Sequence, residues 1–274
     1  MIWRILLVLV VAAGILGGSA YMAYEVFWKP AELDRIEQEE IEAQAALPPP
    51  PHPSLAEFAT AKAALEGGDI VNAESALHAL LDQYPDGPVA ADIRILLGEI
   101  NARAFFSPLP GPGKVEYTVV SGDALAKIAR KENSDAALIF RVNNLETINL
   151  RIGQVLQIPS FDASVVVDPG ARTLTVLNGG RFFKQYPLLG VPGTAAPGEA
   201  KVTGKLATKG DKQIAFGEKE YAGAEKTILV APGQYAMRSM PPDAESPPPG
   251  LVLAPADLEE IYLLVTRGTP ITIR

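Results

Sequence analysis

The chain has 274 residues and a mass of 29.1 kDa, enough for one large domain or for two or three small ones. Its formal net charge of -8 weighs against nucleic-acid binding, which needs clustered Lys and Arg side chains. The absence of cysteine excludes disulfides, thiolate metal sites, a lipid-modified N-terminal Cys and any cysteine nucleophile.

The N-terminal segment, residues 1–28, predicts a transmembrane anchor. No residue from Ile5 to Tyr24 is charged, and a helix of about 20 apolar residues matches the thickness of a bilayer. Arg4 precedes this run and orients the N-terminus to the cytoplasm. The alternative is a cleaved signal peptide, because Gly18-Ser19-Ala20 suits a signal peptidase, but the long uncharged run favours an uncleaved anchor. In both cases we expect the rest of the chain to be exported.

Residues 29–53 predict a stalk and a proline-rich linker. Ala31 to Ala45 is charged and helix-prone without a clear apolar face, which is typical of a solvated stalk. The run from Pro48 to Pro53 enforces an extended polyproline conformation, in which His52 is a spacer residue.

Residues 54–107 predict a helical segment, because apolar and small residues recur at spacings of three and four between turn signals. The expected helices are Leu55–Leu65, Val71–Tyr84 and Val89–Phe105. His78, in the second helix, has no Asp, Glu or His at metal-ligand spacing, so we expect a surface or half-buried histidine and no metal site or cofactor.

The string AKAALEGGDIVNAESALHALLDQYPDGPVAADIRILLGEI resembles a tetratricopeptide-type helical hairpin with a following helix. It holds roughly one and a half repeats, whereas repeat arrays need about three for stability. We therefore expect residues 54–106 to dock on a neighbouring part of the chain or on a protein partner. A helical spacer and a peptide-binding groove are the two alternatives for its role.

Residues 108–115 predict a Pro- and Gly-rich linker, and four short elements follow it. They are a strand at Tyr117–Val120, helices at Ala124–Lys131 and Ala136–Val142, and a strand at Val155–Ile158. We expect the turn Ser121-Gly122-Asp123 to cap the first of these helices.

This βααβ order, with the strings VVSGDALAKIARKE and VNNLETINLRIGQVLQIP, resembles the LysM family over residues 116–160. The resemblance implies that a shallow groove between two loops binds peptidoglycan glycan strands containing N-acetylglucosamine. In such loops backbone amides can bond acetamido groups while apolar side chains contact sugar faces. The groove residues implied are Gly122, Asp123, Ala124, Leu125, Asn144, Leu145, Leu150 and Ile152.

Two observations qualify that implication. Ala124 stands where the family usually has Thr or Ser, so a hydroxyl contact is lost. Asp123 could also serve only as a helix cap and Leu125 only as core, although a groove built from main chain would survive both.

Residues 161–274 predict a mostly β domain with one amphipathic helix, Pro255–Thr266. The expected strands are Ser164–Asp168, Thr173–Asn178, Phe182–Pro187, Lys201–Thr203, Thr227–Ala231 and Ile271–Ile273. The strings SVVVDPGARTLTVLNGGRFFKQYPLLGVPGTAAPGEAKVTGK and LAPADLEEIYLLVTRGTPITI resemble the start and the end of an L,D-transpeptidase domain of the YkuD type.

The mechanism implied by that resemblance requires a cysteine thiolate activated by a histidine. This chain has no cysteine and has no histidine after His78. Aligned without a gap back from Leu253 and Asp257, the family's Cys, Arg and His positions fall at Gly250, Val252 and Pro248, and its upstream His falls at Arg238. A shift by one residue puts Leu251 in the place of the nucleophile and restores no site residue. No catalytic residue is therefore predicted, and the domain is interpreted as a non-catalytic relative that serves as a structural platform or retains a peptide-binding groove.

Together these features predict a multidomain α+β chain anchored in a bacterial inner membrane by a single span, with its remaining domains in the periplasm or cell-wall space. The expected function is peptidoglycan binding through the LysM module, without nucleic acid. The alternatives are a divergent L,D-transpeptidase that acts in peptidoglycan cross-linking and an adaptor that acts through the helices at 54–106.

Overall fold

The computed structural model describes residues 51–193, 197–232 and 236–274, together with 16–29 and the single residues Trp3, Gly14, Arg35 and Gln38. The chain divides into two units, Met1–His52 and Pro53–Arg274.

In the first unit, residues 16–29 are helical and include a π-helical stretch, η1 (Tyr24–Trp28). Lys29 Nζ lies 3.0 Å from the Glu25 carboxylate, one turn away. In the part of the chain that the structure describes, no helix combines the length and the apolar character needed to cross a bilayer. Residues 5–13 and Ile15 of the predicted anchor lie outside the described residues, as do most of the predicted stalk and the proline run up to Pro50.

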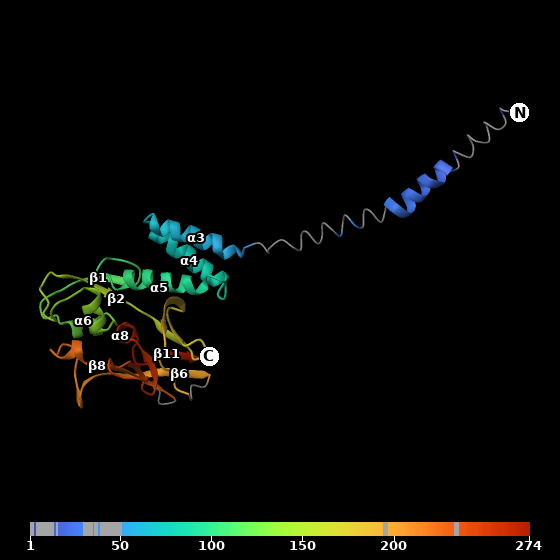
Figure 1. Ribbon diagram of the computed structural model, residues 1–274. Coiled ribbons are helices and arrows are strands. Elements are labelled where there is room, and N and C mark those ends of the chain that lie inside the picture. The colour runs from blue at the N-terminus through green and yellow to red at the C-terminus, as the bar shows by residue number, and fades with distance from the viewer. Residues whose placement is uncertain are drawn as a thin grey trace. The chain divides into compact units, whose positions relative to one another are not determined.

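The second unit begins with three helices that lie side by side in Figure 1: α3 (Pro53–Glu66), α4 (Ile70–Gln83) and α5 (Ala90–Phe105). Gly68 ends the first connection with φ of +85°, a conformation that favours glycine, and the Asp69 side chain caps α4. These helices confirm the three predicted ones within two residues at each end. Their shared core consists of Ala61, Leu77, Leu80, Leu81, Val89, Ala90, Ile93, Leu97 and Ile100.

Helix α5 docks on the C-terminal domain, as expected for a helical segment too short to be stable alone. A Cβ placed at Gly98 would lie 3.0 Å from Lys184 Cγ, so glycine permits the close approach. Asn101 Nδ2 donates to the carbonyl oxygens of Phe182 at 3.3 Å and Phe183 at 2.9 Å. The rings of Phe105 and Phe183 meet edge to face with centroids 5.7 Å apart.

The next elements are β1 (Lys114–Thr118), α6 (Leu125–Lys131), α7 (Ala136–Val142) and β2 (Val155–Pro159). β1 and β2 form an antiparallel pair in which Tyr117 lies opposite Leu156. The βααβ order is therefore confirmed. The first strand lies earlier than predicted, because Val119 pairs with the loop at Gly153 and Gln154 outside the regular ladder.

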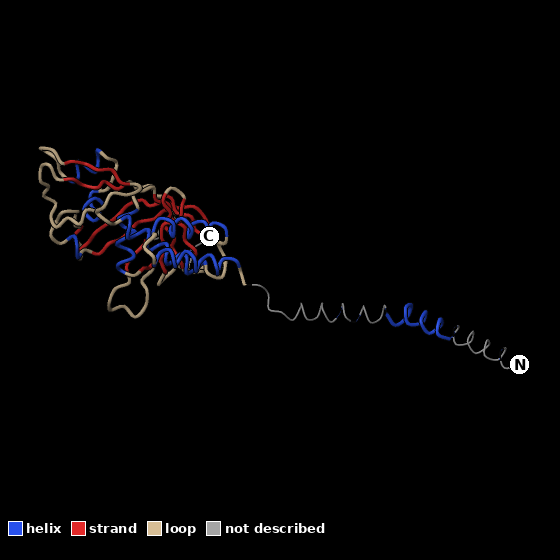
Figure 2. The backbone as a smooth tube through the Cα atoms, turned by 90° about the horizontal axis from the view of Figure 1, so that it is seen from above, coloured by secondary structure: helices blue, strands red, loops and turns tan. Residues whose placement is uncertain are grey.

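Among the residues that the structure describes, the C-terminal domain contains a nine-stranded sheet with the order β10-β9-β8-β6-β11-β3-β4-β5, and β7 pairs with β6. Figure 2 shows strands in red, with the helices in blue. The pairs β11–β3 and β10–β9 are parallel and the others are antiparallel. The strands are β3 (Ala163–Asp168), β4 (Thr173–Asn178), β5 (Arg181–Pro187), β6 (Gly198–Lys209), β7 (Lys212–Gln213), β8 (Glu225–Ala231), β9 (Ala236–Ser239), β10 (Leu251–Leu253) and β11 (Pro270–Ile273). A short 3-10 turn, η2 (Tyr221–Gly223), precedes β8, and helix α8 (Pro255–Leu264) packs on β8 and β9.

Four strands differ most from the prediction. β6 is much longer than the expected Lys201–Thr203, and β7, β9 and β10 were not expected. Only three apolar residues form β10, too few for a periodicity to show. The Gly and Lys residues of β6 conceal its alternation, although it pairs with β8 along most of its length.

One core cluster connects the helices, the βααβ module and the sheet. It joins Phe105 and Phe106 of the helical segment with Leu138 and Val142 of α7 and with the buried faces of the sheet and α8. The three predicted modules at 54–107, 116–160 and 161–274 are thus packed together in one unit, and the boundaries between them remain predictions.

Candidate functional site

Two loops of the βααβ module lie next to each other at one end of the β1–β2 pair. Val119 N donates to Gln154 O at 2.9 Å, and Gly153 N donates to Val119 O at 2.8 Å. Gly122 and Gly153 have φ of +85° and +83°, so both turns use a conformation that L side chains disfavour. The backbone therefore brings the first predicted groove loop beside residues 151–154.

Asp123 holds the first loop in shape. Its carboxylate accepts from Val120 N at 2.9 Å and from the Tyr117 hydroxyl at 3.0 Å. The Val120 amide is the main cause that lowers the pKa of Asp123, with the Tyr117 hydroxyl and two lysines adding to it. The expectation that this turn caps α6 is wrong, because the N-cap is Ala124 and no side chain caps the helix.

Asn143, which directly follows α7, joins this helix to β2. Its Nδ2 donates to Ile139 O at 2.8 Å and to Gln157 O at 2.7 Å, and its Oδ1 accepts from Gln157 N at 2.7 Å. Asn144 follows with φ of +47°, which turns the chain into the second loop. The half-buried Asn143 side chain therefore fixes where that loop begins.

The eight predicted groove residues differ in burial. Gly122, Ala124, Asn144 and Ile152 are exposed, and Ile152 is 73% exposed. Asp123, Leu145 and Leu150 are half-buried, whereas Leu125 is only 3% exposed and belongs to the module's core. The core role considered for Leu125 is thus observed, and the exposed members and the loop backbone remain for a ligand.

The second loop also touches the C-terminal domain, a contact that the sequence did not indicate. Ile148 packs over Gly217, where an added Cβ would lie 3.3 Å from Ile148 Cδ1. Phe216 meets the edge of Phe140 at 5.7 Å between ring centroids, and it packs against the cores of both domains. A loop of the C-terminal domain therefore supports the 144–152 side of the candidate groove.

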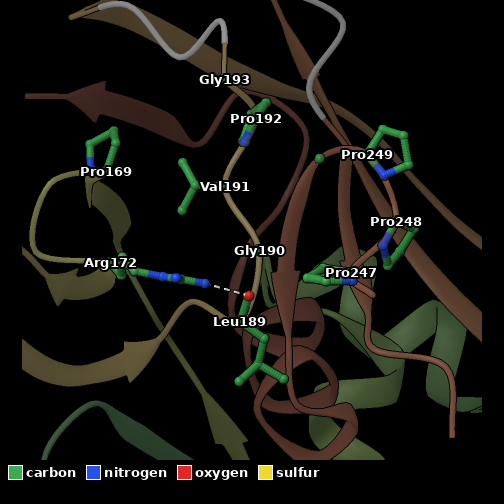
Figure 3. A pocket seen from close by; sticks show the side chains of 11 residues that line it. Pro169, Arg172, Leu189, Gly190, Val191, Pro192, Gly193, Pro247, Pro248 and Pro249 are labelled. Carbon is green, nitrogen blue, oxygen red and sulfur yellow. Dashed lines mark hydrogen bonds between the residues drawn. The ribbon is translucent and has the colours of Figure 1, made fainter. Parts of the chain in front are cut away.

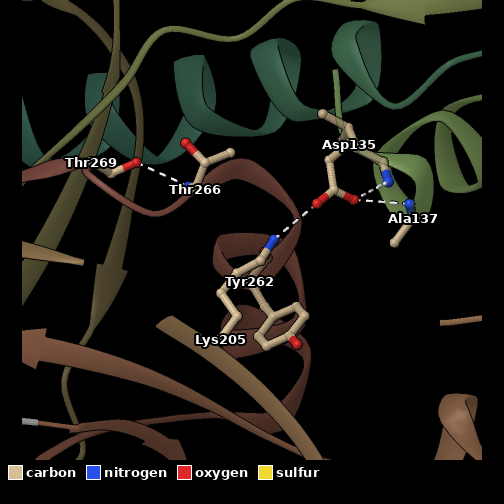
Figure 4. Close-up of polar contacts among 7 residues, drawn as sticks. Asp135, Ala137, Lys205, Tyr262, Thr266 and Thr269 are labelled. Atoms are coloured by element: carbon tan, nitrogen blue, oxygen red, sulfur yellow. Dashed lines mark hydrogen bonds and ion pairs between the residues drawn. The ribbon is translucent and has the colours of Figure 1, made fainter. Parts of the chain in front are cut away.

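An ion pair strengthens the same junction (Figure 4). Lys205 Nζ lies 3.2 Å from Asp135 Oδ2 and donates to Tyr262 O at 2.8 Å, while its amine lies 4.8 Å from the centre of the Tyr262 ring. The other carboxylate oxygen of Asp135 caps α7 through the amides of Ala137 and Leu138. One carboxylate thus connects α7 to the sheet.

In the C-terminal domain the strand pairing brings two predicted site positions together. Val252 of β10 lies opposite Arg238 of β9, with Val252 fully buried and Arg238 exposed. Gly250 has φ of +126°, and a Cβ at this position would overlap the carbonyl oxygen of Ala236. The backbone at 250 therefore has no room for a side chain.

A cavity of about 720 Å³ lies beside this turn (Figure 3). Pro247, Pro248 and Pro249 form one side, and the segment at Gly190 forms the other. The Arg172 guanidinium points to this segment and donates to Leu189 O at 2.6 Å. The charged group at the cavity is therefore engaged with backbone, and neither a thiol nor an imidazole is among the lining residues.

His78 departs from its expected position. It is 4% exposed and not a surface or half-buried residue, because α4 turns it toward α5 and the β4–β5 hairpin. Burial, assisted by Arg181, lowers the pKa of its imidazole.

Several solved structures similar to the C-terminal region are L,D-transpeptidases. L,D-transpeptidase 1 of Mycobacterium tuberculosis is 16% identical with a TM-score of 0.31, and the alignment covers 44% of this chain and 66% of that one. An L,D-transpeptidase from Mycobacterium smegmatis is 14% identical with a TM-score of 0.30, and the alignment covers 45% of this chain and 64% of that one. One from Stackebrandtia nassauensis is 19% identical with a TM-score of 0.31, and the alignment covers 41% of this chain and 55% of that one.

The chain spans less than two-thirds of the length of each of these three structures. At such low identities and TM-scores, the likeness says nothing about what the C-terminal region does. No curated protein matches the chain.

Residues 117–159 match the family of the LysM domain. This range agrees with the βααβ module in the structure and with the predicted boundaries of 116–160. The chain therefore contains a LysM domain, whose two loops are the candidate groove.

Proposed function

We propose that this chain is a membrane-anchored, envelope-facing protein that binds peptidoglycan glycan strands containing N-acetylglucosamine. The observation that carries the proposal is the LysM match at 117–159, with its two loops joined by backbone hydrogen bonds. The uncharged run Ile5–Tyr24 supports a single span in a bacterial inner membrane, with the LysM domain in the periplasm or cell-wall space.

The exposed part of the loops suits a sugar ligand. Gly122 and Gly153 leave the turns without side chains, and Ile152 presents an apolar surface beside them. Val120, at 55% exposed, adds a second apolar side chain next to the same turn and was not among the predicted groove residues. Backbone amides with neighbouring apolar side chains can bond the polar edge of a sugar and cover its face.

The C-terminal domain is proposed to be non-catalytic. Acyl transfer in the family that it resembles requires a cysteine and a histidine, and this domain has neither. In the ungapped register the nucleophile position is Gly250, where the backbone excludes any side chain. Its role in the proposal is to hold the second LysM loop through Phe216 and Gly217.

Sedimentation with insoluble peptidoglycan tests the glycan-binding proposal. We expect the full-length chain, kept in mild detergent, to sediment with the polymer, and we expect Ile152→Asp to weaken binding about tenfold or more, because a buried carboxylate would replace an apolar contact. Ile95→Asp is the matched control, since Ile95 is also an exposed isoleucine, 64% exposed, but lies on α5. If the wild-type chain stays in the supernatant, the proposal fails.

The alternative of a divergent transpeptidase has its own test. The purified chain is incubated with tetrapeptide muropeptides, and release of D-alanine is measured by mass spectrometry. We expect none above a buffer control, and measurable release would overturn the non-catalytic assignment.

A protein partner for residues 54–106 remains part of the proposal. Val71 and Ile70, at 74% and 52% exposed, leave an apolar surface at the start of α4, away from the docked α5. If a partner binds there, Val71→Asp abolishes its recovery in a pull-down, whereas the exposed control Ile95→Asp does not.

A further inference from the structure

A second cavity, of about 390 Å³, lies where the helical segment meets the C-terminal domain. Its walls come from α4, from α5, from the linker around Pro110 and from the β4–β5 hairpin. The volume falls within the usual range for small-ligand sites, about 300–1,000 Å³. The cavity is separate from the LysM loops, because none of their residues lines it.

The base of the cavity is aromatic. Phe105 and Phe183, 7% and 5% exposed, line it and pack edge to face with each other. Phe161 completes the cluster, with ring centroids 5.0 Å from Phe105 and 4.9 Å from Phe183. Phe161 therefore braces the two lining rings, and the exposed edges of Phe105 and Phe183 give the cavity a rigid apolar side that a ligand can contact.

His78 is a buried polar group directed to this cavity. It is 4% exposed and lines the cavity, and among the described residues no group hydrogen-bonds its imidazole. A neutral imidazole offers one hydrogen-bond donor and one acceptor, and a polar ligand in this cavity can bond both.

Planar polar side chains line the same cavity as the imidazole. Asn101 Nδ2 donates to backbone carbonyl oxygens of β5, which leaves the Oδ1 of Asn101 as an acceptor. Asn178 Oδ1 accepts a hydrogen bond from Asp162 N, which leaves the Nδ2 group of Asn178 as a donor. Glu74 adds a carboxylate and Arg181 a guanidinium, so the formal charges of the lining cancel.

We propose that this cavity is a second binding site, which takes one or two residues of a neutral saccharide. A sugar offers adjacent hydroxyls that planar amide, imidazole, carboxylate and guanidinium groups can bond in pairs, and its C–H face covers an aromatic surface. A charged ligand is disfavoured because Glu74 and Arg181 offset each other. The site does not depend on the LysM groove, although both would bind the same polymer.

Imidazole NMR tests the proposal on the full-length chain. The protein contains two histidines, so a ¹⁵N imidazole spectrum reports His78 directly and provides His52, in the linker, as an internal control. Chitotriose is the probe, and we expect the His78 signals to shift saturably while those of His52 stay unchanged. Absence of a His78 shift up to the solubility limit of chitotriose would overturn the proposal.

Variants show where the probe binds. Arg181→Gln should weaken the affinity for chitotriose, read from the His78 shifts, about tenfold, because a charged hydrogen bond is lost. Arg103 is an exposed arginine outside this cavity, so Arg103→Gln should leave that affinity unchanged. Equal affinities for Arg181→Gln and wild type would contradict the site. A His78 shift caused by trialanine and not by chitotriose would overturn the saccharide assignment.

The Ile152→Asp background separates this site from the LysM groove. We expect it to remove the shifts of the Gly122 and Gly153 amides while the His78 response persists. If chitotriose moves only His78, the LysM proposal fails and the cavity proposal stands. If chitotriose shifts only the signals of the loop glycines, the cavity proposal fails and the LysM proposal stands.

Discussion

The LysM loops and the Gly250 turn are two candidate sites that depend on different parts of the chain. The LysM groove consists mainly of loop backbone, which Asp123 and Asn143 hold in place. Alanine at position 124, where the family has a hydroxyl, therefore removes one contact, and the groove itself remains. At Gly250 the expected chemistry requires a side chain, and the backbone excludes one. A site built from main chain therefore tolerates side-chain substitution, whereas a catalytic site does not.

The largest effect is expected from Gly250→Cys, which places a thiol at the nucleophile position. The new Cβ would overlap Ala236 O at a φ of +126°, so we expect a loss of roughly 2–4 kcal/mol in the free energy of unfolding. Urea denaturation measures it, with Gly223→Ala as the control, because an added Cβ there meets nothing within 4 Å. A fully stable Gly250→Cys protein would show that the turn can carry a side chain.

Phe216→Ala tests whether the LysM groove needs the C-terminal domain. The ring is half-buried between two cores, so we expect a stability loss of about 2 kcal/mol and a several-fold weaker binding to peptidoglycan. Phe58→Ala, also half-buried but in the helical cluster, should lose stability without losing binding. Unchanged binding by Phe216→Ala would mean that the groove is independent of its neighbour.

Lys205→Met removes the ion pair at the same junction. We expect the free energy of unfolding to fall by about 1 kcal/mol, less than for Phe216→Ala, because Asp135 keeps its two backbone donors. The control is Lys212→Met, whose pair with Glu218 is largely exposed and should be worth less than about 0.5 kcal/mol. Thermal unfolding of both variants in low salt measures the difference. Equal effects would indicate that the junction pair gains nothing from its burial.

The smallest effect concerns pH and the buried His78 of the helical segment. Burial lowers the pKa of His78 in the folded state, so at a pH between the folded and unfolded values the unfolded chain binds more protons. Stability should therefore fall as pH decreases through the ordinary histidine value of about 6.5. Tm values measured between pH 7.5 and 5.5 test this, and the slope should flatten in His78→Asn. An equal slope of Tm against pH in wild type and His78→Asn would show that other titrating groups cause the pH dependence.

Local pattern was enough for most of the secondary structure. Helix α7 and strand β4 have the predicted boundaries, because each has a clear apolar periodicity and ends at a turn signal. Strands β9 and β10 escaped prediction because they have only four and three residues, too few for an alternation of apolar and polar side chains to show. The burial of His78 was missed because part of what surrounds it, the β4–β5 hairpin, lies about 100 residues further along the chain.

The sequence by itself determined that a LysM domain lies near residues 117–159 and that no cysteine or C-terminal histidine is available for acyl transfer. These properties depend on residue identity and on spacing along the chain. Only the tertiary structure decided that Gly250 has no room for a side chain, that Phe216 supports a LysM loop and that His78 lines a cavity. Each of these depends on contacts between residues far apart in the chain, which packing establishes and local pattern does not encode.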